Sequence, residues 1–496
     1  MPETRSKGIL DLPDELLCTV IEYLLSPSLA EYADDSRTNP GFYNRRYRTR
    51  ALCRLSRACR RLNWVTRDYL YSSFYLTRRY EDDDEAIHLL VRTLIERPEL
   101  HLLFKKATID SSLVGVTVRK APIKRSPQAV DQLLDAPEFK NIPRLERFRH
   151  GIMDGYLDAA TAHLLLLLPN LEDLQIVQHN SLLDKIPRDY YSVNVLDMAG
   201  TLGLTSRFHG FPALRTLQLC FTPQDPAYMS GACLLIPSLR KVRLANVVLW
   251  SPFEHDWKCP PYSSPVTELE LIGFKWDCLR HFGKLFRSFK NLNSVFLDGG
   301  DANWNRATIF QALKNQKHAL ETLTYCHNAM YDGFMPSLQD FKRLRNLAIA
   351  DSSIFDNWLQ SPTQAPTQQE DAASAYFEQL SSTFPPSLEI LTHLIPWTPY
   401  EEEDDGESLF HAWRIKYCRA WEAVPAGLPF HKLQRVCMVA SGFWESSVEY
   451  AVLWPQEEVA EGVFNGRVTD LSQLFDPRLS SPDSSWLHSY DTKAFG

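Results

Sequence analysis

The sequence has no continuous apolar run near the roughly 18 residues that a helix needs to cross a bilayer. Its longest apolar run, Leu164 to Leu168, is five leucines that end at Pro169, which suits a buried helix end. Residues 1 to 11 carry charges and lack the apolar stretch of a secretory signal. With a mean hydropathy of -0.27, these absences predict no membrane residence.

Recognisable catalytic signatures are also missing. The sequence contains no G-x-S-x-G elbow, no H-E-x-x-H metal motif, no Walker loop and no dinucleotide fingerprint. Its fourteen histidines are dispersed along the chain. We therefore expect no catalytic residue, no metal site, no cofactor and no enzyme activity in the chain itself.

Cysteine is scarce, and no two cysteines form a CxxC pair. The closest two of the ten are Cys53 and Cys59. This spacing favours neither a disulfide framework nor a zinc site. A reducing compartment, the cytoplasm and/or the nucleus, fits this usage best.

The net charge of -8 disfavours a general nucleic-acid binder, so we expect no nucleic-acid partner. The charge is uneven, because the stretch from Arg37 to Arg61 holds nine arginines and no acid. Such a stretch can bind phosphate or serve as a nuclear address. It can equally be the solvated face of a loop and a helix, and both interpretations remain open.

Residues 8 to 25 predict a helix that begins at Leu12-Pro13. Proline is tolerated at the first position of a helix, and the acids that follow it favour the helix dipole. The apolar positions of this helix form two adjacent columns. One holds Leu16, Val20 and Leu24, and the other Leu17 and Ile21.

Two further segments predict helices that pack on the first. Residues 51 to 65, ALCRLSRACRRLNWV, carry apolar residues on one face and arginines around it, and residues 69 to 74, YLYSSF, add an aromatic third segment. Together they predict a three-helix unit with an insertion at residues 26 to 50.

The three blocks LPDELLxxVixYL, LxxLSxxCRRLN and YLYxxF resemble the F-box motif in the form common among fungal F-box proteins. The resemblance implies binding to a Skp-type adaptor, which links such proteins to a cullin-RING ubiquitin ligase. It assigns this contact to Leu12, Pro13, Leu16, Leu17, Val20, Leu55 and Cys59. An alternative for some of them, especially Leu17 and Leu55, is that they only pack the three helices together.

A short apolar string recurs ten times through the rest of the chain. The copies are RLERFRH, NLEDLQI, ALRTLQL, SLRKVRL, PVTELEL, NLNSVFL, ALETLTY, RLRNLAI, SLEILTH and KLQRVCM. Their first apolar residues lie 26, 43, 25, 27, 26, 28, 24, 44 and 45 residues apart. Six of these nine spacings fall in the range of leucine-rich repeats, whose inward leucines stack into one apolar column.

Helical patterns lie between the strings, at residues 85 to 97, 156 to 168, 278 to 289, 306 to 317 and 372 to 384. The expected class is therefore α/β, with an N-terminal three-helix F-box followed by an irregular leucine-rich-repeat horseshoe, a solenoid. The expected boundaries are an F-box at 8–76, a linker and cap at 77–141, repeats at 142–441, and a C-terminal cap and tail at 442–496.

A target-binding face follows from the alternation of side chains along a strand. Residues two and four places after the first apolar residue share one face: Asp173, Gln175, Thr216, Gln218, Lys241, Arg243, Glu268, Glu270, Ser294 and Phe296. Lys241 and Arg243 should then lie beside Glu268 and Glu270. The four charges either neutralise one another or form a bipolar target site with Phe296 as an aromatic anchor.

These patterns predict the substrate-recognition adaptor of an SCF-type (Skp-cullin-F-box) E3 ubiquitin ligase. The Skp-type adaptor and the cullin would bind through the helices, and an unidentified target protein would bind the repeats. The alternative is a non-catalytic repeat scaffold that acts outside a ubiquitin ligase. A polar loop at 361–370 and an acidic run at 401–405 are either recognition loops or solvated insertions.

Overall fold

The structure is a computed structural model of the 496-residue chain. It describes residues 11–25, 40–77, 84–110, 145–153, 156–178, 190–202, 209–221, 227–248, 257–273, 279–300, 306–327, 336–349, 381–396, 432–441, 447–454 and 461–465.

One sheet of thirteen strands runs through the described chain. Its strands, in spatial order, are β1 (Ser73–Thr77), β2 (Lys106–Asp110), β3 (Asp173–Gln178), β4 (Thr216–Phe221), β6 (Lys241–Ala245), β8 (Glu268–Ile272), β9 (Ser294–Gly300), β10 (Thr322–His327), β11 (Asn346–Ile349), β12 (Ile390–Pro396), β13 (Arg435–Ser441), β14 (Ser447–Trp454) and β15 (Glu461–Asn465). The first eleven are parallel, and β14 and β15 continue the sheet antiparallel. A small separate pair joins β5 (Ala227–Tyr228) to β7 (Val247–Val248).

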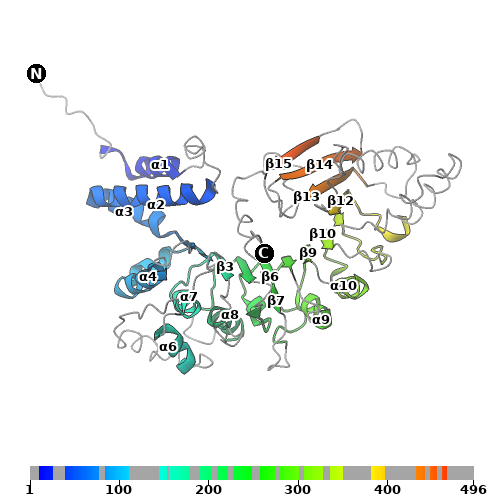
Figure 1. The fold of residues 1–496 in the computed structure, drawn as a ribbon, viewed down its shortest axis with the longest axis horizontal. Coiled ribbons are helices and arrows are strands. Elements are labelled where there is room, and N and C mark those ends of the chain that lie inside the picture. The colour runs from blue at the N-terminus through cyan, green and yellow to red at the C-terminus, as the bar shows by residue number, and fades with distance from the viewer. Residues whose placement is uncertain are drawn as a thin grey trace, which may run out of the picture.

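The helices lie at one end of this sheet and along its outer side. They are α1 (Asp14–Leu25), α2 (Pro40–Ala58), α3 (Arg60–Tyr71), α4 (Asp84–Glu96), α6 (Leu145–Met153), α7 (Leu157–Leu166), α8 (Tyr191–Leu202), α9 (Leu279–Ser288) and α10 (Arg306–Leu313), with 3-10 turns η4 (Pro98–Leu103), η6 (Ala232–Leu235) and η8 (Lys314–Gln316). Figure 1 shows an arc, with the strands on its inner side and α4 to α10 on its outer side. Helices α1 to α3 stand at the N-terminal end of the arc.

The recurring apolar string builds the core of the arc. Its middle positions stack in direct register across six neighbouring strands, as Leu174, Leu217, Val242, Leu269, Val295 and Leu323. All six are buried, as are the first apolar residues from Leu171 to Leu433. Each such side chain contributes about 1.5–3 kcal/mol of transfer free energy. Stacking therefore supplies a continuous core that no single copy could bury.

The expected fold class is wrong in one respect. The sequence predicts a three-helix F-box followed by a separate leucine-rich-repeat horseshoe, a solenoid, whereas the structure has one continuous sheet whose first eleven strands are parallel. The third segment, expected as a helix at residues 69 to 74, is divided between the end of α3 and strand β1. Its aromatic residues suit a strand, and β1 pairs along its whole length with β2. The α/β class is confirmed. The expected domain boundaries stay a prediction.

Other elements are confirmed or corrected one by one. The helices expected at 85–97, 156–168, 278–289 and 306–317 are present as α4, α7, α9 and α10 with η8. The first copy of the string, RLERFRH, is wrong as a strand, because Leu145–Met153 is helix α6. Helix α8 was not expected. Most of the helix predicted at 372–384, and the loops at 361–370 and 401–405, lie outside the described residues.

Half-buried Asp197 and buried Gln316 join successive segments of the helical side. Asp197 of α8 accepts hydrogen bonds from the main-chain N–H and the hydroxyl of Ser230 and from the N–H of Cys233. The side chain of Gln316 in η8 accepts from the N–H of Leu292 and donates to the carbonyls of Phe286 and Phe289. Because burial makes an unpaired polar group costly, these bonds favour one arrangement of neighbours.

Candidate interaction surfaces

The two apolar columns of α1 have different environments. Leu17 and Ile21 are buried, at 1% and 2% exposure, in a cluster with Leu52, Leu62 and Val65 of α2 and α3. Leu17 therefore packs α1 onto α2 and α3, and its contact with an adaptor stays a prediction. Leu16 and Val20 of the first column are not part of this cluster.

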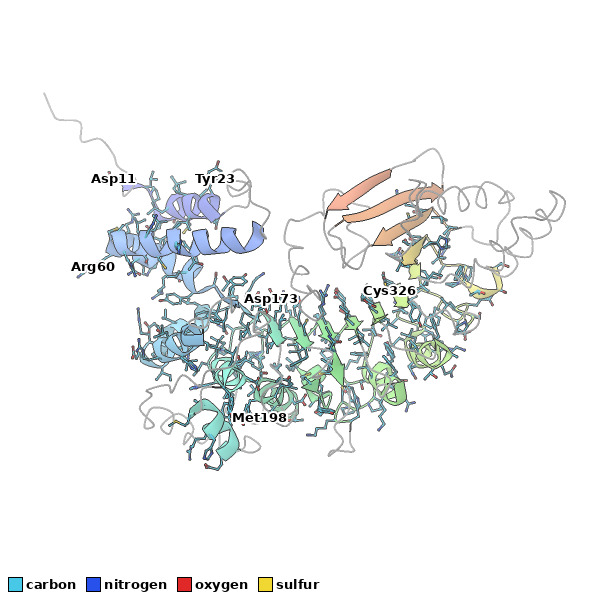
Figure 2. The ribbon with its side chains drawn as sticks, in the orientation of Figure 1. Asp11, Tyr23, Arg60, Asp173, Met198 and Cys326 are labelled. Atoms are coloured by element: carbon cyan, nitrogen blue, oxygen red, sulfur yellow. The ribbon has the colours of Figure 1, made fainter. Side chains whose placement is uncertain are left out.

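Leu16, Val20 and Tyr23 lie on the side of α1 outside the cluster. Leu16 is 49% exposed and Tyr23 is 63% exposed, while Val20 is half-buried. These three lie at i, i+4 and i+7, so they form one stripe along α1. Pro13, at the start of the helix, is also exposed, and Leu12 is half-buried. Figure 2 shows Tyr23 and Asp11 toward opposite ends of this helix.

Leu55 and Cys59 lie beside the helical cluster. The sulfur of Cys59 accepts a hydrogen bond from the N–H of Leu62 at 3.4 Å, and thereby caps α3. The chain is extended at Cys59, which divides the single helix expected at 51–65 into α2 and α3. Both residues are half-buried against the cluster, so they contribute to the packing of the helices. Their contact with an adaptor stays a prediction.

Arg61 fixes the start of α1 on α3, which sequence reasoning missed. Its Nε and Nη2 donate to one carboxylate oxygen of Asp14 at 2.9 and 2.6 Å, and Nη2 also donates to the carbonyl of Leu12 at 2.6 Å. The other end of α1 is held by Tyr69, whose hydroxyl donates to Glu22 at 2.8 Å. Burial and this bond raise the pKa of Tyr69. Arg61 belongs to the CRRLN block, but no local spacing indicates a partner 47 residues away.

The predicted target-binding residues lie on neighbouring strands of the inner face. The register pairs Lys241 with Glu268 and Arg243 with Glu270, and it pairs Glu270 with Phe296. Asp173 and Gln175 lie on β3, two strands before Lys241 and Arg243. Figure 2 shows Asp173 on the inner side of the arc and Met198 on the helical side.

Ion pairs link the charges of this face across the strands. Lys241 Nζ lies 2.8 Å from Glu270 and 3.6 Å from Glu268, and Arg243 Nε lies 3.6 Å from Glu270. Asp173 pairs with Lys106 of β2 at 3.0 Å. Ion pairs therefore link the four central charges. Whether these charges only neutralise one another or also bind a target stays a prediction.

Exposure on the inner face falls along the strands. The side chain of Glu268, in the first inward-facing row, is 50% exposed, whereas that of Arg243 in the second row is 12% exposed. In the third row, Val177, Cys220 and Ala245 form a small buried apolar cluster. Access is therefore greatest at the edge where the strands begin.

No membrane-spanning helix and no metal-binding group occurs among the described residues. None of the helices in these ranges is both long and apolar enough to cross a bilayer. No three His, Cys, Asp or Glu side chains there are grouped so as to hold a metal ion. No family model matches the sequence, and no curated protein matches it either.

Proposed function

We propose that this chain is the substrate-recognition adaptor of an SCF-type E3 ubiquitin ligase that acts in the cytoplasm or nucleus. In this proposal a Skp-type adaptor binds the exposed stripe of α1, and the inner face of the sheet holds a target protein. The chain contributes binding surfaces, and its partners transfer ubiquitin.

The exposed stripe of α1, formed by Leu16, Val20 and Tyr23, is the observation that carries the proposal. Leu17 and Ile21 make the buried apolar contact of α1 with the other helices, and the exposed side chains of Leu16 and Tyr23 lie outside that cluster. Contiguous apolar groups left in water on a short helix are typical of an interaction site. Arg61 and Asp14 hold the start of this stripe in place. The LPDELL and CRRLN blocks resemble the F-box motif, and this resemblance suggests a Skp-type adaptor as the partner.

Replacing Leu16 with Asp should abolish capture of a Skp-type adaptor. An aspartate at this position would place a charge in the centre of the apolar contact, where an unpaired charge is costly. The matched control is Leu102→Asp, because Leu102 is 59% exposed and lies on η4, outside α1 to α3. The two full-length variants should keep the thermal stability of the unchanged chain.

The measurement is co-purification of each variant with a Skp-type adaptor and a cullin. Retention by the unchanged chain and Leu102→Asp, with loss in Leu16→Asp, supports the proposal. If the unchanged chain captures no adaptor, the ligase role is wrong. A target retained without an adaptor would then favour a scaffold that acts outside a ubiquitin ligase.

A smaller loss of adaptor affinity is expected for Arg61→Met. This change removes the bonds to Asp14 and Leu12 but leaves the apolar stripe intact. Both members of the ion pair are more than one-third exposed, so the stability cost should be only about 1 kcal/mol. Titration calorimetry should show a several-fold weaker complex, and an affinity equal to that of the unchanged chain would show that the start of α1 needs no such support.

A further inference from the structure

Three neighbouring side chains on the inner face retain unused hydrogen-bonding groups. Gln175 of β3, Gln218 of β4 and Arg243 of β6 occupy one row in direct register. All three are half-buried, and none donates or accepts a hydrogen bond within the described part of the chain. The Oε1 atom of Gln175 and the Nε atom of Arg243 are buried without a hydrogen-bond partner.

Among these three side chains, Arg243 has the most hydrogen-bond donors without a partner in the described part of the chain. Its side chain is 12% exposed, and its ion-pair partner among the described residues is Glu270, at 3.6 Å. The other carboxylate oxygen of Glu270 already lies 2.8 Å from Lys241. A guanidinium has five N–H donors, so most of those on Arg243 remain available. Buried polar groups without partners are rare in folded proteins and call for an explanation.

We propose that this row binds an extended, acidic segment of a partner protein. The proposal rests on the function proposed above, in which the sheet holds a target. The carboxamides of Gln175 and Gln218 each offer a donor and an acceptor, which match the N–H and C=O groups of a peptide main chain. The guanidinium of Arg243 matches a carboxylate, which it binds with two parallel bonds.

The charge at the adjacent edge favours an acid as the occupant. Arg215 and Arg240, which directly precede the paired residues Thr216 and Lys241, are exposed and form no ion pair among the described residues. The carboxylates of β3 and β8, and of the residue before β3, are in contrast all paired with lysine or arginine. In a chain with a net charge of -8, this edge therefore carries surplus positive charge.

The row also sets the length of the segment. From β3 to β9 the strands are β3, β4, β6, β8 and β9, which at about 4.8 Å per step span roughly 19 Å, or about six residues of extended chain. Phe296 ends this span and is half-buried. It offers an apolar contact to the end of a segment whose acidic residue lies over Arg243.

Fluorescence anisotropy with defined peptides tests the proposal on the full chain. The probe is a labelled peptide of about ten residues, enough to cover the span, that alternates threonine with glutamate and ends in phenylalanine. Two matched peptides carry glutamine or lysine in place of glutamate. The glutamate peptide should bind at least tenfold more tightly than either, and its affinity should fall as salt is added.

Single substitutions assign this binding to the row. Arg243→Gln should lower the affinity for the glutamate peptide at least tenfold and remove the preference for glutamate over glutamine. Gln175→Leu should lower the affinity for the glutamate and glutamine peptides to a similar extent, because it removes a contact with the main chain of the peptide. The control is Arg343→Gln. Arg343 is an exposed arginine that precedes β11 and pairs with Glu321, and its replacement should leave the affinity for all three peptides unchanged. In Arg243→Gln, Glu270 keeps its contact with Lys241, so the thermal unfolding temperature should stay close to that of the unchanged chain.

Several results would overturn the inference. They are equal binding of the lysine peptide, an unchanged affinity in Arg243→Gln, tighter binding of a labelled single-stranded RNA, or a dimer of the unchanged chain that Arg243→Gln abolishes. Loss of peptide binding with adaptor capture intact overturns this inference alone. Failure of adaptor capture with peptide binding intact overturns the ligase role alone.

Discussion

Replacing Gly200 with Ala should be among the most destabilising single changes in this protein. Gly200 lies in α8, where an added Cβ would stand 1.7 Å from the carbonyl oxygen of Ala232 and 2.5 Å from its carbonyl carbon. Both atoms belong to the main chain of η6, so no side chain can rotate away. Helix α8 would have to move from η6, at a cost of about 3 kcal/mol or more.

Gly283 provides the matched control, because it is a helical glycine with space around it. Within the described part of the chain, no heavy atom outside its own helix lies within 4 Å of the position that its Cβ would take in α9. Gly283→Ala should therefore stabilise the chain by about 0.5–1 kcal/mol, through the higher helix propensity of alanine. Urea unfolding of both variants gives the two free energies. A loss below about 1 kcal/mol for Gly200→Ala would show that α8 and η6 are not in such close contact.

Close packing of this kind is what the sequence could not predict. The recurring string predicts the buried positions of nine copies, because its apolar spacing is local and repeats from strand to strand. It says nothing of how near α8 lies to η6, since Gly200 and Ala232 belong to different segments. Helix α8 lies in the irregular 43-residue interval between two copies of the string, so the repeat does not predict it.

The first copy of the string shows how one spacing can fit two structures. Leu145 and Phe148 lie three residues apart, which suits both the L-x-x-L of a strand and one face of a helix. Tertiary packing decides, and Phe148 is buried from helix α6, where its ring lies 5.4 Å from that of Tyr191. Periodicity alone could not have separated the two.

For the candidate surfaces too, some contacts follow from local spacing and others depend on tertiary packing. Alternation along strands predicted the cross-strand contacts of Lys241 with Glu268 and Glu270, because neighbours at matched positions must meet. It could not show that Arg243 keeps free N–H donors, since that depends on which carboxylate oxygen Lys241 occupies. The contact of Arg61 with Asp14 depends on the approach of α3 to α1, which follows from the buried cluster around Leu17.

Replacing Asp197 with Ala should also cost much stability, about 3–5 kcal/mol. The carboxylate of Asp197, a half-buried residue, accepts three hydrogen bonds, and its removal leaves the N–H groups of Ser230 and Cys233 without their acceptor. Each unpaired donor costs about 1–3 kcal/mol. In Asp197→Asn the amide oxygen can still accept from Cys233, and its NH2 group can donate to the Ser230 hydroxyl. The smaller loss should be about 1–2 kcal/mol, for the N–H of Ser230.

The difference in the free energy of unfolding between the unchanged chain and Asp197→Asn should depend on pH, and its sign follows from the pKa of Asp197. Burial raises the pKa of Asp197 above its ordinary value, although the bonds from Ser230 and Cys233 and the charge of Lys258 lower it. The folded state therefore holds this proton more tightly than the unfolded chain, in which the pKa is about 3.9. The contribution to the free energy of unfolding is complete below that value and is lost as the pH rises through the raised pKa.

Asparagine does not titrate, so the advantage of the unchanged chain over Asp197→Asn should shrink as the pH rises from about 4 toward neutrality. Urea unfolding of both proteins over this range measures the difference, and effects of all other titrating groups cancel in it. An advantage that grows with pH would mean that the bonds from Ser230 and Cys233 outweigh burial and that the carboxylate is held in its charged form. In that case the pKa of Asp197 would be lowered, and the junction between α8 and η6 would be held by a buried anion.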